Sequence, residues 1–373
     1  MSESSPETKR QRLALPDGHR YTAPLPLPPP PPPPPVPPSD SILISITDDD
    51  SPSVDKIEQA LCRISIGDKD QIIGALEKLN TWAHSEDSED FFDRFMALGG
   101  IYRLLTFLNN PNIMGDKEYV VLVCDVMCPC DEHGHLTISD DKIKKLAKQL
   151  IELNGIETIL LANKKITGGN DIDELRAVKS IWGLLLDVVD FTPDIVDKEQ
   201  ELAVVDAALD TIHLLKDANN DTHRILLYIF GALHNTMISG KVDESEVIEK
   251  DIIRKCLQAL KTPEGNWNFD IYSWNAAYIF FGVAEKKHKG ILSNNAHFNL
   301  FVSFCIELIN RDPDNSSGVF ELLCKSTNAA GKSLTIKSTS IVAEMGKFLP
   351  STNNDVSQDV KDSAQAFLKN LLI

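Results

Sequence analysis

The sequence has no run of 18 or more apolar residues, and basic side chains are scarce. A helix needs about 20 apolar residues to cross a bilayer, so we expect no membrane span. Lys and Arg total 37 against 55 Asp and Glu, which gives a net charge of -18. Because such a surface repels phosphate backbones and anionic lipid, we expect neither nucleic acid nor membrane as a partner. To the extent that charge guides binding, it favours a basic partner.

A disulfide framework and a secretory signal are also missing. The seven cysteines are an odd number, and four of them lie inside apolar helical patterns, which favours a reduced cytoplasmic or nuclear location. The first residues lack a short basic region followed by an apolar stretch, so we expect no secretory signal. The basic cluster Lys9–Arg12 has two interpretations that stay open, a nuclear-import signal or solvated tail.

Residues 1–52 are predicted to be a disordered, proline-rich tail. They carry equal numbers of acidic and basic side chains up to Asp40, and they cannot build a core. Proline dominates from Pro24 to Pro38, and its fixed φ predicts an extended polyproline II rod. The rod is either a ligand for a polyproline-reading domain or a stiff spacer. The short apolar run Ser41–Thr47 resembles a strand, but it has no neighbour with which to pair.

From Ser53 onward the apolar period is that of a helix. Ile57, Ala60, Leu61 and Ile64 share one helical face, and Ser53 is placed to cap it. Further helices are predicted to begin near Ser88 and to end at glycine pairs or at prolines. Three prolines follow a capping residue and are predicted at the first helical position: Pro193, Pro263 and Pro313. The body, residues 53–373, is therefore predicted to be all-α.

The helices recur as a repeated pair, a shorter helix followed by a longer apolar one. Four pairs follow this plan: 98–108 with 119–127, 153–161 with 175–189, 208–215 with 225–237, and 253–260 with 272–284. Segments 301–309 and 341–349 look like degenerate continuations. The spacing is about 45–55 residues, at or slightly above that of armadillo and HEAT units. One helix pair cannot bury its own apolar face, whereas stacked pairs can.

Named residues carry a resemblance to the armadillo family. Leu98–Ile101 and Asn154–Ile156 resemble the family's "GGI" start of the second helix, and Gly231–Asn235 resembles its "ALxN" third-helix signature. The segments beginning at Ser180 and Ser273 resemble the Trp-led start of that helix. The resemblance covers roughly residues 55–350 and implies a right-handed α-solenoid of divergent armadillo-like repeats, whose third helices line a concave groove.

Within that groove we predict side chains that hold a partner protein or peptide. Aromatic anchors and backbone-binding amides are the expected types, and the candidates are Trp182, Asn235, Trp274, Asn275 and Tyr278. The import-receptor branch of the family uses Trp and Asn four residues apart. Here Trp182 is followed at that spacing by Leu186, and Trp274 by Tyr278, so recognition of import signals is not expected.

The densest group of metal-ligand types is Cys124 to His135, which holds three cysteines and two histidines. Its spacing departs from the usual paired zinc pattern, and Cys124 and Cys128 share one helix face. Helical cysteines that pack as small apolar side chains explain the segment without a metal. The segment Gly331–Ser333 ends like a phosphate-binding loop, but Ser326 stands where that loop needs glycine.

These patterns predict a binding protein and not an enzyme. We expect a monomeric scaffold or adaptor that needs no cofactor or metal. An acidic helical solenoid would bind a protein or peptide in its concave groove, with a proline-rich arm as a second ligand. The alternative is a helical enzyme or zinc-binding protein that uses the Cys124–His135 cluster.

Overall fold

A computed structural model describes most of the helical body. The described residues are 51–130, 136–167, 171–215, 220–262, 265–267, 271–293, 298–311 and 317–330, with a few single positions between 358 and 369. The proline-rich tail, the strand candidate, Pro263, Pro313 and the segment 341–349 lie outside them. The described residues are helical and contain no strand, and none of their helices is long and apolar enough to cross a membrane.

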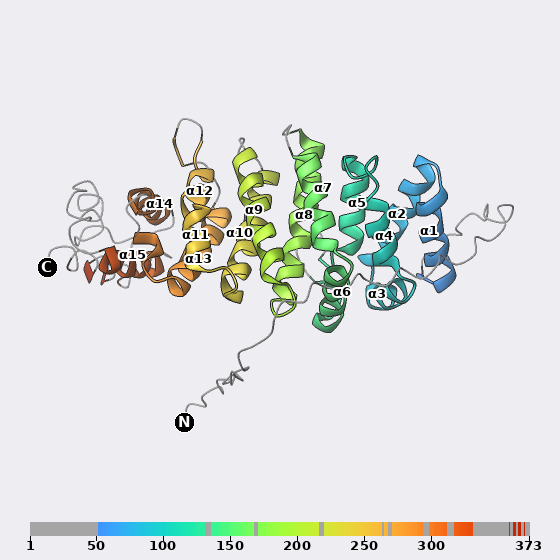
Figure 1. Cartoon of the computed structure of the whole chain (residues 1–373), viewed down its shortest axis with the longest axis horizontal. Helices are drawn as coiled ribbons and strands as arrows, with labels where there is room; N and C mark the ends of the chain where they lie inside the picture. Colours follow the sequence, from blue (N-terminus) through green and yellow to red (C-terminus); the bar gives the residue numbers. More distant parts are fainter. Residues whose placement is uncertain are drawn as a thin grey trace, which may run out of the picture. The chain divides into compact units, whose positions relative to one another are not determined.

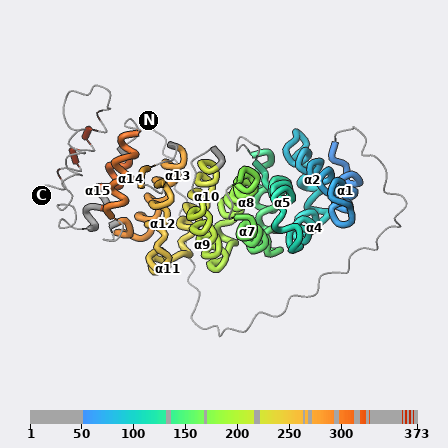
Figure 2. The backbone as a smooth tube through the Cα atoms, turned by 90° about the horizontal axis from the view of Figure 1, so that it is seen from above, coloured from blue at the N-terminus to red at the C-terminus, as the bar shows by residue number. Residues whose placement is uncertain are grey.

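The second helix of each pair packs beside the second helix of the next pair in chain order, and we call these helices row A. Each contacts the next, as Figures 1 and 2 show. The row consists of α2 (Lys69–Ala83), α5 (Lys117–Met127), α8 (Ile172–Phe191), α10 (Asn220–Ser239), α13 (Ile271–Lys287) and α15 (Ser317–Ala330).

A second set of helices, row B, packs in the same order beside row A. Its members contact one another in sequence, and most of them also contact the row A helix that follows in the chain (Figure 2). Row B consists of α1 (Val54–Ile66), α4 (Gly100–Leu108), α7 (Gly155–Ile166), α9 (Lys198–Leu214), α12 (Ile252–Ala259) and α14 (Phe298–Arg311). All four predicted helix pairs are confirmed, as α4 with α5, α7 with α8, α9 with α10, and α12 with α13.

Short helices precede three members of row B. These are α3 (Ser88–Ala97), α6 (Asp140–Glu152) and α11 (Glu244–Glu249), and a short 3₁₀ turn, η1 (Ile291–Ser293), follows α13. Two residues separate each short helix from the row B helix, and the second of them is left-handed in all three cases: Gly99 has φ 68°, Asn154 has φ 56° and Asp251 has φ 54°. The sequence motifs marked the first two of these turns, and the structure adds a third with Asp251.

The residue after the first two of these turns is a glycine for a steric reason. A Cβ atom on Gly100 would lie 2.3 Å from the Phe95 ring, and one on Gly155 would lie 2.7 Å from the Leu150 carbonyl oxygen. Any side chain there would separate the short helix from its row B partner. The "GGI" and "NGI" motifs therefore encode a tight helix-to-helix turn.

The predicted helix starts are confirmed in part. Ser53 caps α1, since its side chain accepts a hydrogen bond from the Lys56 amide at 3.4 Å, and α3 begins at Ser88. The prediction that Pro193 opens a helix is wrong. Pro193 lies in a turn between α8 and α9, and Asp197 caps α9 through a capping box with Gln200. The reciprocal side-chain bonds of that box satisfy two amide donors, which a proline start does not.

Large side chains fill the interface between neighbouring row A helices. Trp182 of α8, Phe230 of α10 and Phe280 of α13 are completely buried, and the Phe230 and Phe280 rings lie 6.1 Å apart. Helix α10 is thus covered on both sides. Burial of this kind is the main source of stability in a helix stack, because each pair shares its core with the next.

Replacing Phe230 should therefore weaken the stack strongly. We expect Phe230→Ala to lower the free energy of unfolding by about 3–4 kcal/mol, because it leaves a cavity between α8 and α13. Leu227→Ala is the control on the same helix; its side chain is 38% exposed, and we expect a loss below about 1 kcal/mol. Urea unfolding followed by circular dichroism measures both. Equal losses would contradict the packing described.

A buried ion pair also holds α9 to the end of α10. Glu201 is almost fully buried; Ser239 donates a hydrogen bond to it at 2.7 Å, and Lys241 lies 3.5 Å away. Burial raises the pKa of Glu201, and Ser239 and Lys241 partly oppose that rise. A carboxyl group whose pKa is higher in the folded than in the unfolded state lowers the free energy of unfolding at pH values above that pKa. The cost disappears as the pH falls below the ordinary value of 4.5, where both states are protonated.

Replacing Lys241 by an uncharged residue should increase that cost. We expect Lys241→Met to lower the free energy of unfolding by roughly 2–3 kcal/mol at pH 8, and by less near pH 4. Lys250→Met is the matched control, since Lys250 is similarly covered but pairs with an exposed Asp206; there the loss should stay below about 1 kcal/mol. Urea unfolding at the two pH values makes the comparison, and a loss independent of pH would argue against a buried charge at Glu201.

Candidate functional site

The two predicted tryptophan anchors lie in the core. Trp182 and Trp274 are completely buried, so in this conformation a partner on the surface would not touch their side chains. The Trp274 ring packs 5.5 Å from Phe304 of α14, with the Arg311 guanidinium 4.5 Å from it. Trp274 therefore packs against α14, and the groove role of the two tryptophans stays a prediction.

The predicted amides are accessible. Asn235 of α10 and Asn275 of α13 are both half-buried. The Oδ1 atom of Asn235 lies 3.1 Å from the Nδ1 atom of His234, which holds the amide in place. Tyr278 is half-buried as well, and a Cβ on Gly318 would lie 2.6 Å from its hydroxyl, so this ring packs closely against α15. Burial raises the pKa of Tyr278.

Four large apolar side chains beside these amides were not predicted. Leu227 and Ile238 of α10 are 38% and 46% exposed, and Tyr272 and Ile279 of α13 are 71% and 51% exposed. On α10 they lie eight and three residues from Asn235, and on α13 three and four residues from Asn275, so each set shares one helical face with its amide. We name Leu227, Asn235, Ile238, Tyr272, Asn275 and Ile279 the α10–α13 face. The helical period of apolar residues could have indicated these four side chains. It did not separate them from the core, because both the buried and the exposed stripe of each helix are apolar.

The charge of this face differs from that of the whole chain. Among the described side chains of α10 and α13, the exposed charged ones are Arg224, Lys286 and Lys287. Lys287 also donates a hydrogen bond to the Ile238 carbonyl oxygen at 2.8 Å. These two helices therefore carry exposed positive charge, although the net charge of the chain is -18 and Glu321 of the adjacent α15 acts on Tyr278.

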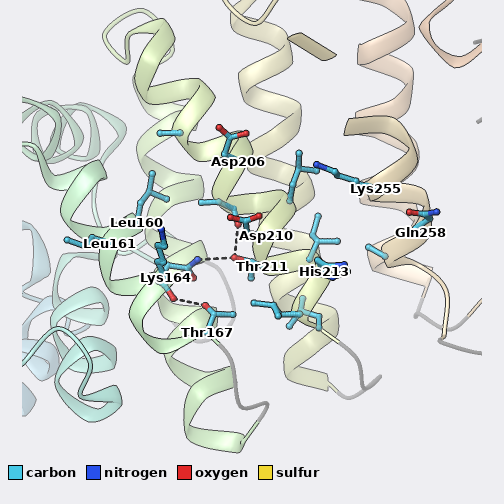
Figure 3. A pocket seen from close by; sticks show the side chains of 18 of the residues that line it. Leu160, Leu161, Lys164, Thr167, Asp206, Asp210, Thr211, His213, Lys255 and Gln258 are labelled. Atoms are coloured by element: carbon cyan, nitrogen blue, oxygen red, sulfur yellow. Dashed lines mark hydrogen bonds between the residues drawn. The ribbon is translucent and has the colours of Figure 1, made fainter. Parts of the chain in front are cut away.

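A cavity of about 1100 Å³ opens on row B, between α7, α9 and α12 (Figure 3). Leu160, Leu161 and Lys164 of α7 form one wall, and Lys255 and Gln258 of α12 form the other. Between these walls, α9 contributes Asp206, Asp210, Thr211 and His213 to the lining. Ligand-binding pockets typically combine apolar walls with a few polar or charged groups, as this cavity does.

A buried hydrogen bond forms the base of this cavity. Asn163 of α7 donates from Nδ2 to the Thr211 hydroxyl at 2.9 Å, and Thr211 donates in turn to the Ala207 carbonyl oxygen at 2.8 Å. The Oδ1 atom of Asn163 is buried and has no hydrogen-bond partner within the described chain. A buried acceptor of this kind is costly, and a ligand donor or a water molecule would satisfy it.

The structure separates the cysteines of the Cys124–His135 segment. Cys124 is completely buried in α5, and burial raises the pKa of its thiol. Cys128 and Cys130 follow the end of α5 and lie beside Asp187 of α8, with sulfur-to-carboxylate distances of 3.4 to 3.7 Å. His133 and His135 lie outside the described residues. Sequence reasoning missed Asp187 because it is more than 50 residues away from the cysteines.

The environment of this cluster shifts the pKa of its groups upward. Burial raises the pKa of Asp187 to about 6, and the hydrogen bonds from the two thiols act in the opposite direction. The hydrogen bond with Cys130 and burial raise the pKa of Cys128. Burial also raises the pKa of Tyr228 on α10, and the nearby Cys128 adds to that rise. The cluster therefore joins the end of α5 to α8.

The hydrogen bond at the base of the cavity can be tested directly. We expect Thr211→Val to lower the free energy of unfolding by roughly 1–2 kcal/mol, because the buried Asn163 amide then has no acceptor. Adding Asn163→Leu should recover part of this loss, since the double variant removes both polar groups. Thr81→Val is the control: its hydroxyl also bonds to a helix carbonyl but is exposed. If Thr211→Val unfolds at the same midpoint concentration of urea as the wild type, the bond does not stabilise the fold.

Comparisons with known proteins add a structural likeness. No family model and no curated protein matches the chain. A crystal structure described as that of an engineered protein is similar at 15% sequence identity, over 85% of this chain and 78% of its own, with a TM-score of 0.41. The function is therefore inferred from the residues of this chain itself.

Proposed function

We propose that residues 53–373 form a divergent, right-handed armadillo-like solenoid that acts as a protein-binding scaffold, with row A lining its concave side. Two features support this architecture: rows A and B continue in chain order, and the left-handed turn at Gly99 recurs at Asn154 and Asp251. Stacked helix pairs of this type present extended surfaces to other proteins. The scaffold needs no catalytic group for this role.

The observation that carries the proposal is the α10–α13 face. Four large apolar side chains are exposed on two adjacent helices, next to two amides. Contiguous apolar surface rimmed by polar groups marks interaction sites in soluble proteins. Apolar anchors supply most of the binding energy, while Asn235 and Asn275 pair with the backbone of a bound peptide.

The local charge defines the ligand further. Arg224, Lys286 and Lys287 border the face, so the ligand is an extended or helical segment with apolar and acidic side chains. We favour this ligand over the basic partner that the net charge alone predicts, because a bound peptide senses nearby charges much more strongly than distant, screened ones. The proline-rich stretch Pro24–Pro38 is a second, separate ligand for a polyproline-reading domain. We also propose that the protein is located in the cytoplasm or the nucleus.

A peptide selection tests the face. A displayed library of random peptides is selected on the full chain, and the affinities of the recovered peptides are measured for the wild type and for variants. We expect the peptides to combine apolar with acidic residues and to lose at least tenfold in affinity for Ile279→Asp, about 1.4 kcal/mol. Salt should weaken their binding.

Ile248→Asp is the matched control. Ile248 is 47% exposed, against 51% for Ile279, but it belongs to α11, which packs against α12. Deleting residues 1–50 should leave peptide affinity unchanged. Recovered peptides that bind Ile279→Asp as tightly as the wild type, or that require residues 1–50, would overturn the assignment of this face.

A further inference from the structure

Two adjacent helices of row A bring three metal-ligand side chains together. Cys128 caps the end of α5, Cys130 follows two residues later, and Asp187 lies near the end of α8. The two sulfur atoms and the carboxylate all lie within 4.8 Å of one another. The Sγ atom of Cys128 is 3.4 Å from Asp187 Oδ2, and that of Cys130 is 3.5 Å from the same oxygen.

These separations match those around a tetrahedral zinc ion. Zinc bonds of ~2.3 Å to sulfur and ~2.1 Å to oxygen, set at the tetrahedral angle, place sulfur and oxygen about 3.6 Å apart. The observed sulfur-to-oxygen distances range from 3.4 to 3.7 Å. In the metal-free chain these contacts are thiol hydrogen bonds to the carboxylate. An ion would replace the two thiol protons and release them to solvent, with little movement of the side chains.

Hydrogen bonds hold the cysteine segment in place before any ion binds. The Thr137 amide and hydroxyl both donate to the Pro129 carbonyl oxygen, at 2.8 and 2.9 Å. A ring nitrogen of His84, at the end of α2, lies 3.0 Å from the Cys130 carbonyl oxygen. Cys130 also pairs with Leu136 across an isolated bridge. A ligand segment fixed in this way loses little entropy on binding.

We propose that Cys128, Cys130 and Asp187 bind a zinc ion that joins α5 to α8. Two thiolates and one carboxylate form a ligand set that suits zinc. Zinc takes four ligands, and a water molecule completes the set. Cys124 is not a ligand, because it is completely buried inside α5. The proposal is independent of peptide binding at the α10–α13 face.

Metal titration of the full chain tests this site. The chain is purified under reducing conditions, stripped of metal with a chelator, and titrated with zinc against a coloured chelator and with cobalt as a spectroscopic probe. We expect one ion per chain, a thiolate-to-cobalt charge-transfer band, and the release of up to two protons from the thiols on binding. Cys128→Ser, Cys130→Ser and Asp187→Asn should each weaken zinc binding by at least tenfold, about 1.4 kcal/mol.

Cys62→Ser is the matched control, because Cys62 is also a partly exposed free cysteine but lies in α1. It should bind zinc as the wild type does. Circular dichroism of each metal-free variant checks its helicity. An affinity unchanged by Asp187→Asn, or retained when both Cys128 and Cys130 are serine, would overturn the three-ligand site.

A measurement on the wild type alone avoids any folding defect in the variants. Alkylation of the metal-free and zinc-loaded chains is mapped by mass spectrometry. Zinc should protect Cys128 and Cys130 and leave the alkylation of Cys62 unchanged. Equal alkylation of Cys128 and Cys130 with and without zinc, or no zinc bound at stoichiometric concentration, would refute the proposal.

Discussion

The close packing of α10 between α8 and α13 is the constraint on which the other features of the chain depend. Gly231 of α10 lets Leu186 approach, since a Cβ there would lie 2.9 Å from that side chain, and the Tyr228 ring lies over Gly183. With α9 behind it and a neighbour on each side, α10 has one remaining face. Any partner of α10 must use that face, so its composition determines the chemistry of binding.

The same constraint explains what could be predicted from the sequence. Helix pairs, capping at Ser53 and the turns at Gly99 and Asn154 are local features, and each was recognised from a period or from a residue with special backbone geometry. Pro193 was placed incorrectly, because a proline fits a turn as well as a first helical position. The turn at Asp251 was missed because no glycine follows it.

Functional residues were harder to predict because they depend on helix rotation and on distant contacts. Trp182 and Trp274 are among the largest side chains of row A, and in a stack with two buried sides the largest side chains fill the interfaces. Ile279 is apolar but exposed, so hydrophobicity alone could not separate core from surface. Asp187 meets the cysteines only because α8 packs beside α5, a contact that local sequence patterns do not reveal.

Metal binding and peptide binding would both act on row A, but on different interfaces. In a stack of helices each unit contacts only its neighbours, so the stability of one interface affects mainly the units beside it. A zinc ion between α5 and α8 would lock that interface directly. Helix α10 links the two regions, because Tyr228 lies close to the cysteine cluster while the adjacent Leu227 belongs to the α10–α13 face. The ion would therefore affect the α10–α13 face through the packing of α8 on α10, where Tyr228 covers Gly183.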